Sequence, residues 1–108
     1  MKLFPIAFVI PLYACTTSHG HNRELIVTGT LEDTQYIETI DDFGLNSVFA
    51  ANLRIEDIFH GESQESVLRV RYIAHMERHS LEKARLRLAT DGIYEVCATK
   101  GGRGYTCD

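Results

Sequence analysis

The chain has 108 residues, the length of one domain, and its 44% hydrophobic and 24% charged residues are typical of a globular protein. Its formal net charge of −4 argues against nonspecific nucleic-acid binding, which depends on an excess of Lys and Arg. Residues 24–108 alone would form a small core, and a domain of that size benefits from a covalent cross-link.

The N-terminus has the pattern of a secretory signal peptide. Lys2 supplies one positive charge, and residues 3–12 (LFPIAFVIPL) carry none. This uncharged run is too short to cross a bilayer core of about 30 Å, which requires about 20 helical residues, and Pro5 and Pro11 disfavour a long helix. We therefore predict a signal peptide at residues 1–14. The alternative is a buried N-terminal strand of the domain.

Residues 12–15 (LYAC) resemble the lipobox of bacterial lipoproteins, in which an aliphatic, a variable and a small residue precede a cysteine. The resemblance implies cleavage before Cys15, diacylation of its thiol, and attachment to a membrane without a spanning helix. Thr16 stands where an acidic residue signals retention in the inner membrane. The resemblance therefore implies a lipid-anchored protein of the bacterial cell envelope, at the outer membrane and facing the periplasm.

Residues 15–23, which begin at the lipidated cysteine, are rich in Thr, Ser, Gly and Asn, the composition of a flexible tether. We interpret His19 and His21 as parts of this tether. The alternative is that they bind a divalent metal beside the free N-terminus.

With Cys15 lipidated, Cys97 and Cys107 remain, and two cysteines in an exported protein are expected to form a disulfide. A three-residue turn at residues 101–103 would place them directly opposite each other across an antiparallel hairpin, with their Cα atoms ~4.5 Å apart. The alternatives are a zinc site, for which the C-x-x-C spacing is missing, and a catalytic thiol.

Alternation of apolar and polar residues predicts mainly extended segments after residue 23. Gly29 inside the first of them predicts a bend or bulge. Residues 77–84 (ERHSLEKA) favour one helical turn capped by Ser80. The predicted extended segments are residues 24–33, 34–40, 47–59, 67–76, 84–89, 92–99 and 104–107.

Five or six strands with at most one short helix predict an all-β fold, a small OB-like barrel over residues 24–108. The chain resembles the OB barrels of tissue metalloprotease inhibitors and netrin modules at the corner Phe59–His60–Gly61 and in the late G-x-Y-x-V of residues 92–96. That inhibitor family inserts a free N-terminal cysteine into a protease zinc site. A lipidated Cys15 could not do so, and inhibition of an envelope hydrolase remains an alternative by fold analogy.

Two groups of residues are candidates for binding an anionic partner. The first contains four arginines that alternate with apolar residues, and their guanidinium groups would share one face if the two strands were adjacent. The second is the terminal hairpin, where an aromatic ring lies beside two cations. The alternatives are a solvated face of cross-strand ion pairs and an ordinary edge hairpin. The residues are Arg69, Arg71, Arg85 and Arg87 in the first group, and Lys100, Arg103 and Tyr105 in the second.

We find no constellation of catalytic residues, no metal-ligand motif and no cofactor motif. We therefore expect a non-enzymatic, lipid-anchored binding or structural module that contacts an envelope protein or an anionic envelope polymer, and no nucleic acid. The alternative is a metal-handling or enzymatic protein that uses His60, His75 and His79.

Overall fold

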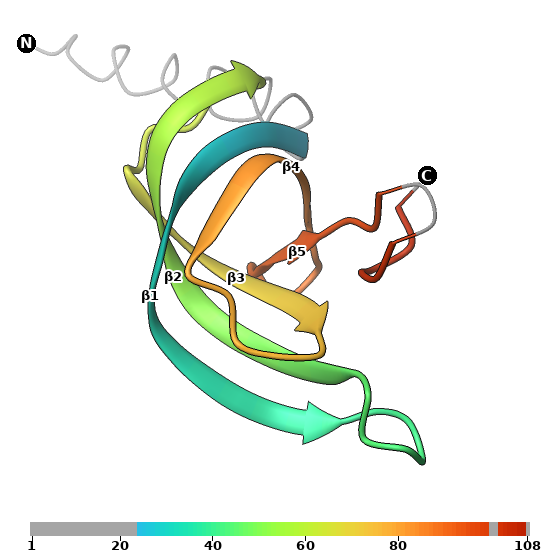
Figure 1. Ribbon diagram of the computed structural model, residues 1–108. Coiled ribbons are helices and arrows are strands. Elements are labelled where there is room, and N and C mark those ends of the chain that lie inside the picture. The colour runs from blue at the N-terminus through green and yellow to red at the C-terminus, as the bar shows by residue number, and fades with distance from the viewer. Residues whose placement is uncertain (1–23, 100–101, 108) are drawn as a thin grey trace, which may run out of the picture.

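The computed structural model describes residues 24–99 and 102–107 (Figure 1). These residues form five strands and no helix, which confirms the predicted all-β class. The strands are β1 (Glu24–Thr39), β2 (Ser47–His60), β3 (Val67–Ala74), β4 (Ser80–Leu88) and β5 (Tyr94–Val96).

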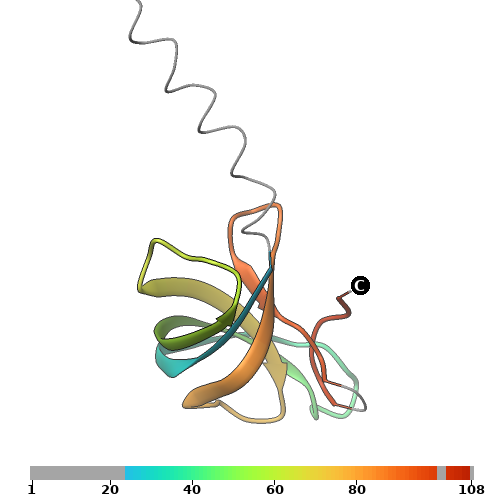
Figure 2. The same cartoon turned by 90° about the horizontal axis from the view of Figure 1, so that it is seen from above.

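The strands close into a small barrel in the order β1-β2-β3-β5-β4, with β4 pairing back to β1. All neighbours are antiparallel except β3 and β5, which run parallel through Val70–Tyr94 and Arg71–Glu95. Figure 2 shows this closed ring from above. The small barrel of five or six strands predicted from the strand pattern is therefore confirmed, and it has five strands.

The first strand is one continuous, curved β1 rather than the two extended segments that the sequence predicts. Up to Thr30 it pairs with both β2 and β4, whereas from Leu31 to Thr39 its only partner strand is β2. The bend predicted at Gly29 is present as a register shift, and a Cβ atom there would collide with the backbone of Arg54. Glycine thus lets β1 and β2 approach closely where β1 turns around the barrel.

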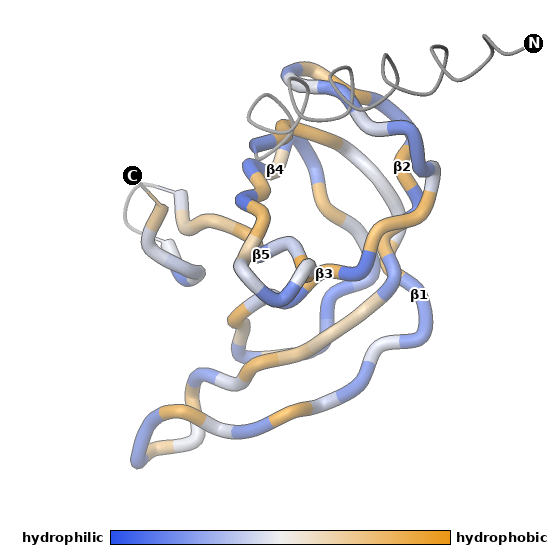
Figure 3. The backbone as a smooth tube through the Cα atoms, turned by 180° about the vertical axis from the view of Figure 1, so that it is seen from behind, coloured by the Kyte–Doolittle hydropathy of each residue, from blue (hydrophilic) through white to orange (hydrophobic). Residues whose placement is uncertain are grey.

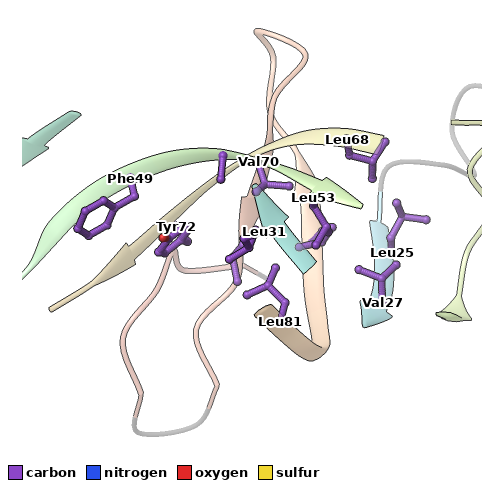
Figure 4. Close-up of a cluster of buried hydrophobic side chains, with 12 residues drawn as sticks. Leu25, Val27, Leu31, Phe49, Leu53, Leu68, Val70, Tyr72 and Leu81 are labelled. Carbon is purple, nitrogen blue, oxygen red and sulfur yellow. The ribbon is translucent and has the colours of Figure 1, made fainter. Parts of the chain in front are cut away.

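The core consists of side chains from alternate positions of all five strands, which point into the barrel (Figure 4). Phe49 stacks on Tyr72 with ring centroids 5.3 Å apart. Tyr72 is fully buried, and its hydroxyl accepts a hydrogen bond of 2.9 Å from the backbone N–H of Arg78. The buried cluster is Leu25, Val27, Leu31, Phe49, Ala51, Leu53, Leu68, Val70, Tyr72, Leu81, Leu86 and Val96.

The helical turn predicted for residues 77–84 is wrong, because Ser80 begins strand β4 and caps no helix. The reason is a bulge at Lys83, which has a positive φ of 48° and donates its N–H to the Thr28 hydroxyl at 2.9 Å. The bulge lets Leu81 and Leu86 both point inward although they are five positions apart. Because five is an odd number, this spacing does not fit the period of two by which a strand is predicted from sequence.

The disulfide predicted between Cys97 and Cys107 is present, with a Cα–Cα distance of 5.6 Å. The predicted antiparallel register is wrong, since Cys97 forms a parallel bridge with Tyr105. The N–H of Tyr105 donates to the Val96 carbonyl at 3.1 Å, and the N–H of Ala98 donates to the Tyr105 carbonyl at 2.8 Å. We call residues 97–107 the stapled loop; its residues 100 and 101 lie outside the described part.

Candidate functional site

Several predicted features lie outside the described residues. These are the signal peptide at residues 1–14, the lipidated Cys15, the tether at residues 15–23 with its two histidines, and Lys100 of the stapled loop. Three surfaces of the barrel are candidate sites. The outer face of β3, β5 and β4 and a cavity under the stapled loop hold predicted candidate residues, whereas the projecting part of the β1–β2 hairpin holds none of them.

The arginine-bearing strands β3 and β4 are not neighbours, because β5 lies between them. The two strands are instead linked through Glu95 of β5. Its carboxylate accepts hydrogen bonds from Arg71 at 3.2 Å and from Arg87 at 3.0 Å. Arg71 also pairs with Asp91 at 2.7 Å. The pKa of Arg71 is raised, chiefly by the hydrogen bond to Asp91, against a smaller opposing effect of burial.

The other two arginines of this group are also engaged. Arg69 donates to the side-chain oxygens of Asn52 at 3.1 Å and Gln35 at 3.0 Å. Arg85 pairs with Glu24 at 2.6 Å. Most of the hydrogen-bonding capacity of this face is therefore directed to side chains of the same molecule, in the manner of cross-strand ion pairs.

Tyr105 does not stand at an exposed tip but lies half-buried against the barrel. Burial raises its pKa, while the positive charge of Arg71 and a hydrogen bond from that side chain oppose the shift. Arg87 donates to the Thr106 carbonyl at 3.1 Å. These contacts attach the stapled loop to the ion pairs of β3 and β4. Arg103, at the exposed bend of the loop, lines the cavity and also a second pocket beside Ile40 and Asn46 of the hairpin.

The cavity lies between the stapled loop, the β3–β4 connection and the start of β4, and its volume is about 100 Å³. The buried side chains of Tyr72, Val96 and Cys97 form part of its wall. Three cationic residues and one acidic residue also line it, namely Arg78, Lys83, Arg103 and Glu82. The cavity is therefore a small polar recess with an excess of positive charge.

The β1–β2 hairpin projects from the barrel and ends in a turn at residues 40–46 (Figure 1). Asp41 holds this turn, because its carboxylate accepts hydrogen bonds from the Leu45 N–H at 2.8 Å and the Asn46 side chain at 2.9 Å. Slight desolvation raises the pKa of Asp41, but these hydrogen bonds outweigh it and lower the pKa overall. The turn is thus ordered by its own side chains.

Large apolar side chains on this hairpin are exposed to solvent. Phe43 at the turn has 85% of its surface accessible, although a phenylalanine is normally buried. Figure 3 shows hydrophobic and hydrophilic segments interleaved along the projection. We call the exposed apolar residues the hairpin tip: Tyr36, Ile37, Ile40, Phe43 and Leu45. This surface was not predicted, because residues 41–46 only separate two predicted extended segments in the sequence; the signal that could have revealed it is a phenylalanine between acidic residues and glycine.

The hairpin that carries this tip contributes acidic groups and no basic one, although His75 and Arg103 of other segments lie beside it. Between Glu24 and Leu53 the sequence contains no Lys, Arg or His. The projecting part contains four carboxylates, those of Asp33, Glu38, Asp41 and Asp42. The surface is therefore both apolar and negatively charged.

The three candidate histidines are not brought together. His75 lies beside the hairpin turn, with Nδ1 3.2 Å from the Leu45 carbonyl oxygen. His60 ends β2 and pairs with Ile26, at the far end of that 14-residue strand. His79 precedes β4, and its carbonyl accepts the Leu31 N–H at 2.8 Å. Within residues 24–99 and 102–107, no group of three or more His, Cys, Asp or Glu side chains is placed to hold a metal ion.

No protein-family model matches this chain, and neither a curated protein nor a solved structure matches it significantly. The described residues also contain no helix with the length and apolar character needed to cross a membrane.

Proposed function

We propose that this chain is a lipid-anchored, non-enzymatic binding module of the bacterial envelope, and that its hairpin tip docks on a partner protein. The observation that carries the proposal is the exposure of five large apolar side chains on one projecting hairpin. Large apolar side chains exposed together on one projection are a mark of interaction sites. Burying one such side chain contributes about 1.5–3 kcal/mol, so several together favour association.

The charge of the hairpin specifies the chemistry of the partner. A hairpin that has an apolar tip, four carboxylates and no cation of its own is complementary to an apolar surface flanked by Lys or Arg. The same charge repels an anionic polymer or an anionic lipid surface. The arginines of β3 and β4, which could otherwise attract a polymer, are already bound to side chains of this molecule. A protein is therefore the partner that this surface fits.

The direction of β1 supports the same proposal. This strand has 16 residues, about 50 Å of chain at ~3.3 Å per residue, and it carries the hairpin tip at the end opposite Glu24 (Figure 1). If lipid is attached at Cys15, upstream of Glu24, the hairpin tip points away from the membrane surface. It would then meet proteins of the periplasm rather than the bilayer that holds the anchor.

Photochemical crosslinking in cells that produce the full chain tests the docking surface. A photoreactive phenylalanine analogue replaces Phe43, and the matched control carries it in place of Gln64, an exposed residue beyond the other end of β2. We expect one discrete protein adduct at position 43 that disappears with the additional change Leu45→Asp. Mass spectrometry should place the contact on an apolar surface of the partner flanked by Lys or Arg.

Three outcomes would contradict the docking proposal: an adduct only with lipid, an adduct only with a second copy of this chain, or a contact on an acidic surface. If the partner is an envelope hydrolase, adding the protein to that purified enzyme also tests the alternative of inhibition.

The anchor has a separate test. Radiolabelled palmitate should enter the chain in bacteria, Cys15→Ser should abolish the label, and globomycin should cause the unprocessed precursor to accumulate. Absence of label from the parent chain would remove the anchor while leaving the docking surface to be judged by the crosslinking.

A further inference from the structure

Two arginines differ from the other five in the described part of the chain. Arg78 and Arg103 have no ion pair and no side-chain hydrogen bond within residues 24–99 and 102–107. Both line the cavity of about 100 Å³ beneath the stapled loop. The other five are each held by a carboxylate or an amide oxygen: Arg54, Arg69, Arg71, Arg85 and Arg87.

The surroundings of the cavity leave its positive charge largely uncompensated. Lys83 also lines the cavity, but its ammonium group lies over the ring of Phe59, which is not part of the lining, 5.4 Å from the ring centroid. Glu82 supplies a single opposing carboxylate among the residues that line the cavity. Two arginines and one glutamate at the same cavity leave an excess of positive charge, so a bound anion would be stabilised there.

The backbones that carry both arginines are fixed in advance. The N–H of Arg78 is held by the buried Tyr72 hydroxyl at 2.9 Å, and the next residue is tied to β1 through its carbonyl. Next to Arg103, the Gly102 N–H donates to the Thr99 carbonyl at 2.8 Å. The disulfide closes the same loop. Positions fixed before binding lower the conformational entropy that a ligand must overcome.

The size of the cavity limits what it can hold. A volume of about 100 Å³ accommodates several water molecules, and therefore a carboxylate or phosphate group, but not a stretch of polymer. Guanidinium groups present paired N–H donors whose spacing matches the oxygens of both anions. The hydroxyl-bearing Thr99 also lines the cavity. The volume of the cavity and the hydrogen-bond donors that line it together favour a small oxyanion.

We propose that this cavity is a binding site for a small oxyanion, a carboxylate or phosphate group, held by Arg78 and Arg103. The proposal goes beyond the docking function and depends neither on the lipid anchor nor on the hairpin tip. The group belongs either to a free metabolite or ion or to a larger ligand that inserts only its charged end.

Titration followed by NMR tests the site on the exported, disulfide-bonded full chain carrying Cys15→Ser. Sodium phosphate and sodium acetate are added separately, with chloride keeping the ionic strength constant. We expect saturable shifts of the backbone amide signals of Lys83, Thr99 and Gly104 with at least one of the two anions. Phosphate alone, acetate alone, or both will show which oxyanion the site accepts.

Variants separate a built site from general attraction to positive charge. The double change Arg78→Gln and Arg103→Gln should weaken binding by at least about tenfold. The matched control Arg54→Gln also removes an exposed arginine, one paired with Glu32 at 2.8 Å, and should leave binding unchanged. Arg103→Lys keeps the charge but loses the paired donors, and should give an intermediate affinity even if the double variant does not fold.

Three results would overturn the proposal. One is the absence of saturable shifts with both anions, and another is equal weakening by Arg54→Gln. The third is an unchanged affinity in a folded double variant. The titration uses no partner protein and no membrane, so its failure would leave the proposed docking function untouched.

Discussion

The two halves of strand β1 experience different environments although they belong to one continuous strand. Residues 24–30 pair with β4 and, from Ile26 onward, also with β2, and every second side chain is buried in the barrel. Residues 33–39 pair only with β2, and nearly all of their side chains are exposed. Apolar residues occur in both halves, so hydrophobicity alone does not identify the core.

This difference separates residues that the fold needs from residues that it can spare. Val27 lies fully buried in the first half, whereas Ile37 in the second half is 50% exposed. Removing apolar surface from the barrel should therefore unfold the protein, and removing it from the projecting hairpin should not. Apolar residues that contribute little to folding are the ones whose presence calls for another explanation, such as docking.

The largest effect on stability is expected in a comparison of two leucines. Leu53 of β2 is fully buried, and Leu45 lies 47% exposed at the hairpin tip. Leu53→Ala should lower the free energy of unfolding by about 2–5 kcal/mol, because it leaves a cavity in the packed barrel. Leu45→Ala should change it by no more than about 0.5 kcal/mol. Urea denaturation measures both values, and comparable losses would show that the hairpin is part of the core.

The pattern of residues predicted the barrel better than it predicted the surfaces. Leu68, Val70 and Tyr72 of β3 alternate regularly, so both the strand and its buried face follow from the sequence. The start of β4 could not be predicted in this way, because the bulge at Lys83 breaks the alternation of apolar and polar residues. A local pattern records the period of a strand but not the irregularities that a neighbouring strand imposes.

The surfaces depend on contacts between distant parts of the chain. The disulfide was predictable because two cysteines remained to pair, but its parallel register depends on how Tyr105 fits beside Val96. Nothing in the sequence shows that β5 separates the arginine-bearing strands, or that Arg78 and Arg103 line one cavity. These residues are brought together when the barrel closes. The local sequence pattern does not reveal the register in which the closing strands pair.

A smaller effect on stability is expected in a comparison of two glycines with left-handed backbone conformations. Gly61, at the corner after β2, has φ of 86°, and a Cβ atom there would lie 2.7 Å from Leu25 Cδ2. Gly44, in the hairpin turn, has φ of 72°, but a Cβ atom would meet nothing within 4 Å. Gly44→Ala should therefore introduce backbone strain alone, about 1 kcal/mol. Gly61→Ala should destabilise by about 2–4 kcal/mol, because overpacking adds to the strain.

Thermal and urea unfolding of the two glycine variants measure this difference. Equal losses of stability in the two variants would mean that backbone strain alone accounts for both losses and that the barrel corner is loosely packed. A far larger loss of stability for Gly44→Ala than for Gly61→Ala would show that the hairpin turn supports the barrel. It would contradict the interpretation that the fold can spare the projecting half of β1.

The smallest effect concerns two aspartates whose pKa values are lowered for different reasons. The pKa of Asp91 is lowered chiefly by its hydrogen bond with Arg71, next to the barrel. At Asp41 slight desolvation raises the pKa, but hydrogen bonds from uncharged groups of the hairpin turn lower it overall. In both cases the stabilisation is complete above the usual carboxyl pKa of about 3.9, and it is lost as the pH falls through the lower folded-state value.

Salt should distinguish the two aspartates. Asp91→Asn and Asp41→Asn should each flatten the loss of stability below about pH 4, measured by urea unfolding over a range of pH. The Debye length falls from ~10 Å at 0.1 M salt to ~3 Å at 1 M, which weakens the partly exposed ion pair of Asp91 with Arg71. The difference between the parent chain and Asp91→Asn should therefore shrink in high salt, whereas the difference for Asp41→Asn should persist. Equal salt dependence would mean that the hairpin turn is also held by charge, and that its carboxylates are less available to a basic partner than the docking proposal requires.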